Sequence, residues 1–278
     1  MSDQPYVSLN DGRRMPQLGL GVWQANDKET YHAVAAAIRA GYRMIDTAMV
    51  YQNESAVGRA VNDSGVARDE LFITTKLWNS DQGTRNVRPA IESSLKRLGT
   101  EYVDLYLIHW PTPARDLYVE TWREFEKLKA DGLTKSIGVS NFRVEDLERL
   151  KSETGIVPSV NQIELHPRFQ QHELRDYCQK EGIAVESWSP IGGSKNDLLS
   201  DETLKVIGSR HGKSAAQVVI RWHLQHGFIV IPKSVREQRI YENFNVYDFE
   251  LSPDDMSLID KLDSGDRTGP NPATMNNH

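Results

Sequence analysis

The sequence predicts an α/β fold, a closed (β/α)8 TIM barrel with an N-terminal β-hairpin cap, and three observations support this. Short apolar runs alternate with longer segments whose apolar residues recur every three or four positions, as strands and helices do. Eight such alternations can be counted along the 278 residues. That number of units in about 250 residues suits a closed parallel barrel. An open, doubly wound sheet would show the same alternation and remains the alternative.

The β-hairpin is expected at the start of the chain. Two short apolar runs within residues 6–22 lie on either side of Asn10-Asp11-Gly12, which is a strong tight-turn sequence. The barrel strands are then expected within eight ranges. These ranges are 17–22, 42–48, 71–78, 102–110, 134–141, 159–165, 183–190 and 228–234.

Helices are expected between the strands, and glycines mark where they end. The clearest helical segments are 29–41, 87–99, 118–132 and 215–227, and each closes on a glycine. Glycine tolerates the left-handed conformation with which many helices stop. Because no linker rich in Pro, Gly or Ser divides the chain, residues 1–278 are expected to form a single domain.

The bulk composition excludes several classes of protein. A net charge of −6 and a pI of about 5.8 argue against binding to nucleic acid or to a membrane surface. No apolar run approaches the ~18 residues of a membrane span, and the first residues do not resemble a signal peptide. The one cysteine, Cys178, permits no internal disulfide and is expected to pack inside a helical segment. A cytoplasmic protein that acts as a monomer is therefore expected.

Polar side chains stand at the ends of most predicted strands. In a (β/α)8 barrel the active site forms at the carboxyl ends of the strands. Taken singly, each residue has a structural explanation, such as helix capping for an aspartate or core hydrogen bonding for a histidine. A ring of them at equivalent positions predicts an active site. The residues are Asp46, Lys76, His109, Ser140, Asn141, Gln162, Glu164, Trp188, Ser189, Lys233 and Ser234.

Rival chemistries find less support in the sequence. No metal site is expected, because the chain has no HxH or HExxH motif and His223 and His226 have no carboxylate nearby. A glycosidase needs two carboxyl groups across a cleft, for which Glu164 and Glu186 could be named, although nothing in the sequence prefers them. The stretch "GLGVW" (19–23) lacks the third glycine of a Rossmann fingerprint.

Six long motifs, in order, resemble those of the aldo-keto reductases. The resemblance extends from "VSLNDGRRMPQLGLGVW" to about residue 265 and is most like the bacterial 2,5-diketo-D-gluconate reductase group. One departure is Gln52, which replaces a frequent glycine. The motifs are "IDTAMVYQNE" (45–54), "TTKLWN" (74–79), "LGTEYVDLYLIHWP" (98–111), "SIGVSNF" (136–142), "VNQIELHP" (160–167) and "IPKSVREQRIYENF" (231–244).

The resemblance implies NADPH-dependent carbonyl reduction by a tetrad of Asp46, Tyr51, Lys76 and His109. The cofactor supplies the hydride, since no side chain can do so. Tyr51 is then the proton donor, and Lys76 makes its phenolate easier to form. Asp46 holds Lys76 in place, and His109 orients the carbonyl oxygen.

The resemblance also implies which residues hold NADPH. One group binds or stacks on the nicotinamide: Ser140, Asn141, Gln162 and Trp188. A second group, in the loop that follows, covers the pyrophosphate: Ser189, Ile191, Gly192 and Lys195. A third group binds the 2′-phosphate and the adenine: Lys233, Ser234, Val235, Arg236, Arg239, Glu242 and Asn243.

The substrate pocket is expected at the mouth of the barrel. Trp23, Trp78 and Trp110 would form an apolar wall, and the tail after Asp263 is polar and short. Such a tail suggests an open pocket that accepts varied small-molecule carbonyls, including diketo sugar acids. The alternative function is an NADPH-binding regulatory subunit with the same fold.

Overall fold

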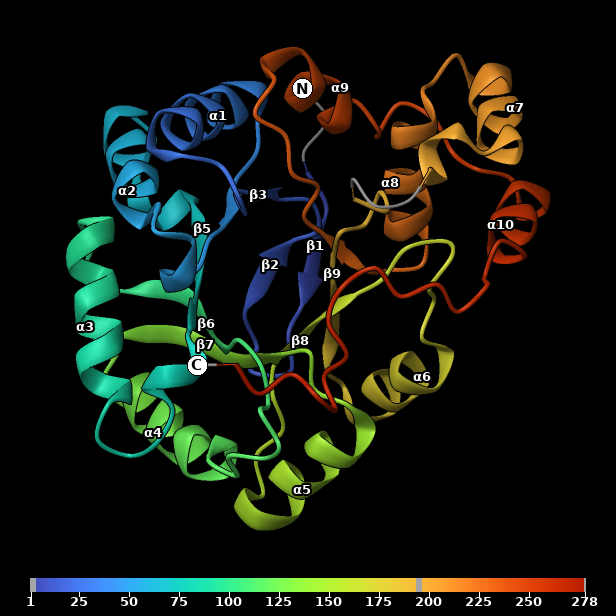
Figure 1. The fold of residues 1–278 in the computed structure, drawn as a ribbon. Coiled ribbons are helices and arrows are strands. Elements are labelled where there is room, and N and C mark those ends of the chain that lie inside the picture. The colour runs from blue at the N-terminus through green and yellow to red at the C-terminus, as the bar shows by residue number, and fades with distance from the viewer. Residues whose placement is uncertain (1–3, 194–196, 278) are drawn as a thin grey trace.

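The computed structural model describes residues 4–193 and 197–277 (Figure 1). Its centre is an eight-stranded parallel sheet in which the strands are paired in sequence order. The sheet curls until its two ends meet, where Leu18 pairs with Val230 and Gly21 pairs with Lys233. The predicted barrel is confirmed, and each strand lies within its expected range. The strands are β3 Leu20–Gly21, β4 Met44–Asp46, β5 Phe72–Leu77, β6 Val103–Ile108, β7 Thr134–Ser140, β8 Val160–Glu164, β9 Ala184–Trp188 and β10 Ile229–Val230.

Helices surround the sheet in Figure 1. Gly41, Gly99, Gly132 and Gly227 all have positive φ angles, so the predicted helix stops are confirmed. At its start, α1 is held by a capping box between Asn26 and Glu29. The helices are α1 Asp27–Ala40, α2 Glu54–Asp63, α3 Val87–Leu98, α4 Tyr118–Ala130, α5 Val144–Thr154, α6 His172–Glu181, α7 Glu202–His211, α8 Ala215–Gln225, α9 Glu237–Phe244 and α10 Pro253–Asp260.

The predicted hairpin closes one end of the barrel. Strands β1 (Tyr6–Ser8) and β2 (Arg14–Pro16) pair in antiparallel fashion. Leu9, directly after β1, and Met15, within β2, are buried in one cluster with residues from the amino ends of the barrel strands, such as Met44 and Phe72. The opposite end, where the strands finish, is therefore the end at which a site can form. No helix among the described residues is long and apolar enough to cross a membrane.

Alternate residues of each strand face the barrel axis, and this inner face changes from apolar to polar along the strands. On β8 and β9, Val160 and Ala184 belong to the inner cluster, whereas Ile163 and Val185 pack in the outer layer against helices. Residues two positions beyond the inner ones therefore face the axis as well. These inner positions near the carboxyl ends hold Asp46, Lys76, Gln162 and Glu186, all of them buried.

Candidate active site

A buried ion pair lies at the centre of the site. Lys76, on the inner face of β5, places its Nζ 2.6 Å from Asp46 Oδ1 at the end of β4. The same ammonium donates to the backbone carbonyl of Thr47 at 2.9 Å. The side chain of Lys76 is fully buried, so its positive charge needs a negative partner, and the Asp46 carboxylate supplies it. Asp46 is therefore placed where it can hold Lys76, the role that the resemblance implies.

Tyr51 reaches this pair from the loop that follows β4. The loop forms a 3₁₀ turn over Met49–Tyr51, and Gln52 ends it with a φ of 57°, in the left-handed region. That backbone explains why glycine would suit the position of Gln52. Asn53 fixes the end of the turn by hydrogen bonds to Thr47 and to the carbonyl of Val22. As a result, Tyr51 Oη lies 3.5 Å from Lys76 Nζ.

Burial and neighbouring charges shift the pKa values of Tyr51 and Lys76 in opposite directions. Burial raises the pKa of Tyr51, and the nearby Lys76 ammonium lowers it without fully reversing the effect. For Lys76, burial lowers the pKa, but Asp46, Tyr51 and Glu186 together outweigh burial and the pKa ends above its usual value. Lys76 is thus a stable cation, and Tyr51 is protonated at neutral pH. The lysine reduces the cost of forming a phenolate within a buried site.

His109, directly after β6, completes the group. Its ring lies beside those of Tyr51 and Trp78, with centroid distances of 5.7 and 5.2 Å. Burial and the Lys76 charge lower the pKa of His109 well below its usual value, so the imidazole is neutral. Asp46, Tyr51, Lys76 and His109 therefore meet at one end of the barrel, as predicted. Their individual roles in a reaction remain predictions.

The three tryptophans of the predicted substrate wall differ in exposure. Trp23 is 54% exposed, Trp78 is partly exposed and Trp110 is only 6% exposed. The carbonyl of Trp110 accepts a hydrogen bond from Gln82, which ties this residue into the loop after β5. Trp23 and Trp78 are accordingly the better candidates for contact with a substrate.

The residues predicted to hold the nicotinamide form one hydrogen-bond network. Asn141 donates to the His109 carbonyl at 3.0 Å, and its Oδ1 accepts from Trp188 Nε1 at 2.8 Å. Ser140 Oγ donates to the carbonyl of Gln162 at 2.9 Å. The network fixes the indole of Trp188 next to the tetrad, with part of its surface exposed.

The predicted phosphate-binding residues gather where α9 begins. Lys233, Arg236 and Arg239 are exposed, and none of them forms an ion pair with the described residues. Ser234 accepts from the backbone N–H of Arg236 at 3.1 Å and so shapes the turn. Unpaired cations beside a helix start suit a phosphate group.

The other residues predicted to bind the cofactor differ in burial and in their place in the fold. Glu242 accepts a hydrogen bond from Ser214 at 2.5 Å, and Asn243 is buried. Lys195 lies outside the described residues. The remaining members of the set are placed in the loops that follow β9 and β10: Ser189, Ile191, Gly192 and Val235.

The tail after α10 covers more of the mouth than the sequence suggested. In Figure 1 it runs across the end of the barrel toward β6 and β7. Asn276 accepts from the backbone of Ala114 at 3.0 Å, and Asn79 donates to the carbonyl of Asn277 at 2.9 Å. The tail therefore narrows the mouth, because even a short polar tail can be held by side chains that project from the barrel.

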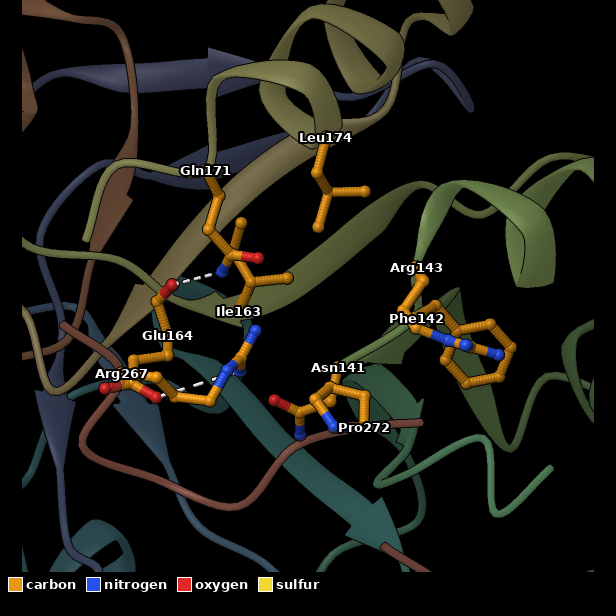
Figure 2. A pocket seen from close by; sticks show the side chains of 9 residues that line it. All are labelled: Asn141, Phe142, Arg143, Ile163, Glu164, Gln171, Leu174, Arg267 and Pro272. Atoms are coloured by element: carbon orange, nitrogen blue, oxygen red, sulfur yellow. Dashed lines mark hydrogen bonds and ion pairs between the residues drawn. The ribbon is translucent and has the colours of Figure 1, made fainter. Parts of the chain in front are cut away.

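Glu164, at the end of β8, anchors this tail. Its carboxylate accepts from the N–H and the hydroxyl of Thr268, both at 2.6 Å, and from the N–H of Gly269 at 3.0 Å. Figure 2 shows Glu164 with Arg267, which it faces at 3.9 Å, and with Gln171, which donates to its carbonyl. The cavity beside them has about 20 Å³, room for one water molecule.

The sequence named Glu164 and Glu186 but did not indicate their roles, as the anchor of the tail and as the neighbour of the Asp46–Lys76 pair. A glutamate within the apolar run of residues 183–190 was the available signal for Glu186. No sequence pattern linked Glu164 to residues about a hundred positions away. The two glutamates are both fully buried, which argues against a glycosidase pair in an open cleft.

His226, directly after α8, corrects another expectation. His226 lies 3.0 Å from Asp260, so a carboxylate is nearby after all, brought there by α10. Even so, the described residues contain no group of three or more side chains able to hold a metal ion. Cys178 is buried, as expected, and burial raises the pKa of its thiol to about 12.

Comparison with known proteins agrees with this geometry. The model of the "Aldo/keto reductase family" matches residues 16–264. The methylglyoxal reductase DkgA of Yersinia pestis is 54% identical, with 99% of both chains covered. The glyoxal reductase of Bacillus subtilis is 53% identical over 97% of this chain and 96% of its own.

Solved structures give the same result. An aldo/keto reductase from Brucella melitensis has a TM-score of 0.90 and 58% identity, covering 94% of this chain and 100% of its own. A mutant of Gox0644 in complex with NADPH has a TM-score of 0.93 and 50% identity, covering 98% of both chains. The fold and the site thus define a barrel oxidoreductase. The chain belongs to the aldo/keto reductase family, whose members are NADPH-dependent.

The residues present fit that cofactor. The unpaired cations near the start of α9 offer charge for a 2′-phosphate, and Trp188 offers a partly exposed ring for the nicotinamide. Gln162 presents its side-chain oxygen, since its Nε2 is occupied by hydrogen bonds to Asp46 and Glu186. A carboxamide N–H₂ is the complementary donor for that oxygen.

Proposed function

We propose that this protein reduces short α-dicarbonyl compounds, such as methylglyoxal and glyoxal, with NADPH. The observation that carries the proposal is the buried chain from Asp46 through Lys76 to Tyr51, beside a neutral His109. It combines a proton donor, a cation that assists the donor and a neutral hydrogen-bonding ring. These are the groups that reduction of a carbonyl requires in addition to a hydride source.

Each residue has a distinct part in the proposed reaction. NADPH, when bound, supplies the hydride to the carbonyl carbon. Tyr51 donates its hydroxyl proton to the oxygen, and Lys76, 3.5 Å away, stabilises the phenolate that forms. The neutral ring of His109 donates an N–H to the same oxygen and orients it. Asp46 keeps Lys76 charged and fixed in place.

The size of the substrate is suggested by the mouth of the barrel. The tail lies against Trp188 and Glu164, close enough that an added Cβ on Gly269 would be 2.3 Å from the Trp188 ring. We expect a small dicarbonyl to bind beside Trp23, Trp78 and His109 with the tail in its present position. The reductase names of the relatives from Yersinia pestis and Bacillus subtilis agree with such a substrate.

Larger diketo sugar acids, such as 2,5-diketo-D-gluconate, are the second candidate. The resemblance to reductases of that group favours them, whereas the position of the tail does not. We further propose that the protein acts as a monomer, because all four members of the tetrad come from one chain.

The test measures NADPH oxidation against methylglyoxal, glyoxal, simple aldehydes and 2,5-diketo-D-gluconate, with wild-type protein and Tyr51→Phe. We expect the highest kcat/KM for methylglyoxal, and about a 10²–10⁴-fold lower kcat in the variant. Unchanged turnover in Tyr51→Phe would remove the proposed proton donor. NADPH binding without turnover of any carbonyl would instead favour the regulatory alternative.

A further inference from the structure

Glu186 is a buried carboxyl group directly beneath the tetrad. It lies on β9, two residues before Trp188, and its strand neighbours in register are Gln162 on β8 and Ile229 on β10. The side chain is 0% exposed. Its position in the inner face of the barrel means that it points toward the axis rather than toward the helices.

One amide connects Glu186 to the tetrad. Gln162 Nε2 donates to Asp46 Oδ2 and to Glu186 Oε2, both at 2.8 Å. The other oxygen, Glu186 Oε1, is buried and has no hydrogen-bond partner among the described residues. A buried polar atom of this kind is costly in a folded protein unless it serves another purpose.

The charges around Glu186 leave no cation to neutralise it. The charged or titratable groups that interact with it are Asp46 from β4, Lys76 from β5 and Tyr51 from the 3₁₀ turn, and apolar Ile229 is its register neighbour on β10. Lys76 is already paired with Asp46 at 2.6 Å. A second carboxylate beside that pair would be an uncompensated buried charge.

The protonation of Glu186 follows from these surroundings. Burial, followed by the Asp46 carboxylate, raises the pKa of Glu186 to about 8, although Gln162 and Lys76 act in the opposite direction. When Glu186 does ionise, its charge raises the pKa of both Tyr51 and Lys76. The charge state of Glu186 therefore affects the pKa of Tyr51, the proposed proton donor.

We propose that Glu186 is a positioning residue whose ionisation, through Gln162 and Lys76, extends the pH range over which Tyr51 retains its proton. The proposal rests on the proposed role of Tyr51. At neutral pH the protonated carboxyl leaves the Asp46–Lys76 pair electrically balanced. At alkaline pH the new negative charge opposes loss of the Tyr51 proton. The bond from Gln162 also holds that amide with its oxygen free for the cofactor.

The test compares pH profiles of kcat/KM for methylglyoxal reduction in wild type and Glu186→Gln. Glutamine has the same shape but cannot ionise, so Tyr51 should lose its proton at lower pH. We expect the alkaline limb to move down by at least about half a pH unit. The matched control is Glu202→Gln on α7, whose side chain is 82% exposed. It should superimpose on wild type.

A second measurement needs neither cofactor nor substrate. Infrared difference spectra of the wild-type protein should show a protonated-carboxyl band that titrates near the pKa of Glu186, about 8, and that is absent in Glu186→Gln. Overlapping pH profiles, or loss of activity without a shift of the limb, would overturn the proposal. So would absence of the band from wild type. Because the spectra do not depend on turnover, they separate this failure from failure of Tyr51 as donor.

Discussion

Glu164 and Glu186 occupy neighbouring strands of the same barrel, and both are buried, yet their surroundings differ completely. Burial raises the pKa of Glu164, but hydrogen bonds from His166, Thr268 and Gly269 outweigh it, and the pKa ends below its usual value. Glu186 accepts a hydrogen bond only from the Gln162 amide among the described residues. That one bond does not offset burial and the nearby Asp46 carboxylate, which raise the pKa of Glu186 to about 8. One carboxyl is a charged anchor and the other is neutral.

The comparison shows that hydrogen-bond donors and neighbouring charges, together with burial, decide the state of a buried carboxyl. The charged carboxylate of Glu164 accepts hydrogen bonds from the backbone of the tail and so has a structural role. Glu186 keeps its proton and lies next to Asp46 and Lys76, where chemistry is expected.

Lys76→Met should have the largest effect, because it turns Asp46 into a second buried carboxyl without a cation. We expect kcat to fall by about 10²–10⁴-fold. The free energy of unfolding should fall by about 3–5 kcal/mol, since removing one partner of a buried pair leaves the other uncompensated. Steady-state kinetics and urea unfolding would measure both quantities.

The control for this variant is Lys127→Met, on α4, where the side chain is 64% exposed and paired with Glu124. It should change unfolding by less than about 1 kcal/mol. Nearly normal kcat in Lys76→Met would show that the proton donor works without its cation, and the proposed tetrad would have to be abandoned.

Arg236→Ala combined with Arg239→Ala tests cations that have no partner within the described chain. If they bind a 2′-phosphate, KM for NADPH should rise by about 100-fold, while KM for NADH, which lacks that phosphate, should change little. Kinetics with both cofactors would measure the ratio. Arg39→Ala is the matched control, since Arg39, on α1, is exposed and already pairs with Glu237 of α9. Equal losses for the two cofactors would count against the phosphate site.

Much of this arrangement could be predicted from local sequence. Strand-end positions such as Asp46, Lys76 and His109 are determined by apolar periodicity, because the carboxyl ends of parallel strands meet at one rim. The helix stops followed from glycines such as Gly41 and Gly99, since the left-handed conformation is a property of the single residue. Motif resemblance added Tyr51, which lies on a loop with no periodic signal.

The contacts of the tail and of Glu186 could not be predicted in the same way. Glu164 meets Thr268 and Gly269 only because the chain returns from α10 across the mouth. The state of Glu186 depends on Asp46 and Gln162, which are brought beside it by closure of the barrel. The number of hydrogen-bond donors around a buried carboxyl group depends on the assembled structure. It cannot be predicted from the spacing of residues or from composition.

Glu164→Gln tests the charged member of the pair. The amide would present N–H groups where Thr268 and Gly269 already donate, so we expect a loss of about 1–3 kcal/mol in docking of the tail. Amide hydrogen exchange over residues 264–277 should become about tenfold faster or more. Protection that stays at the wild-type level would mean that Glu164 does not anchor the tail.

The pH dependence of this effect has a definite sign. Because the pKa of Glu164 is lowered in the folded state, its contribution is present above the pKa of the free group, about 4.3, and is lost as pH falls through the folded value. The difference in stability between wild type and Glu164→Gln should therefore be largest near pH 7 and shrink on acidification.

For Glu186→Gln the pH dependence of stability has the opposite sign. The raised pKa makes wild type lose stability from about pH 4.3 up to about 8, so the variant gains relative to wild type as pH rises.

Gly269→Ala should have the smallest effect and tests the same anchor without touching its charge. The new Cβ would lie 2.3 Å from the Trp188 ring and 3.0 Å from Glu164 Oε2, so the tail must shift outward. Its backbone has no positive φ, and strain from glycine replacement does not add to the effect. Since the tail can move without unfolding the barrel, we expect a cost of about 0.5–1.5 kcal/mol, below the usual range for overpacking. Exchange over 264–277 should quicken by about fivefold, with Thr274→Ala as the exposed control in the same tail. An effect as large as that of Glu164→Gln would indicate that packing on Trp188, rather than the carboxylate, holds the tail in place.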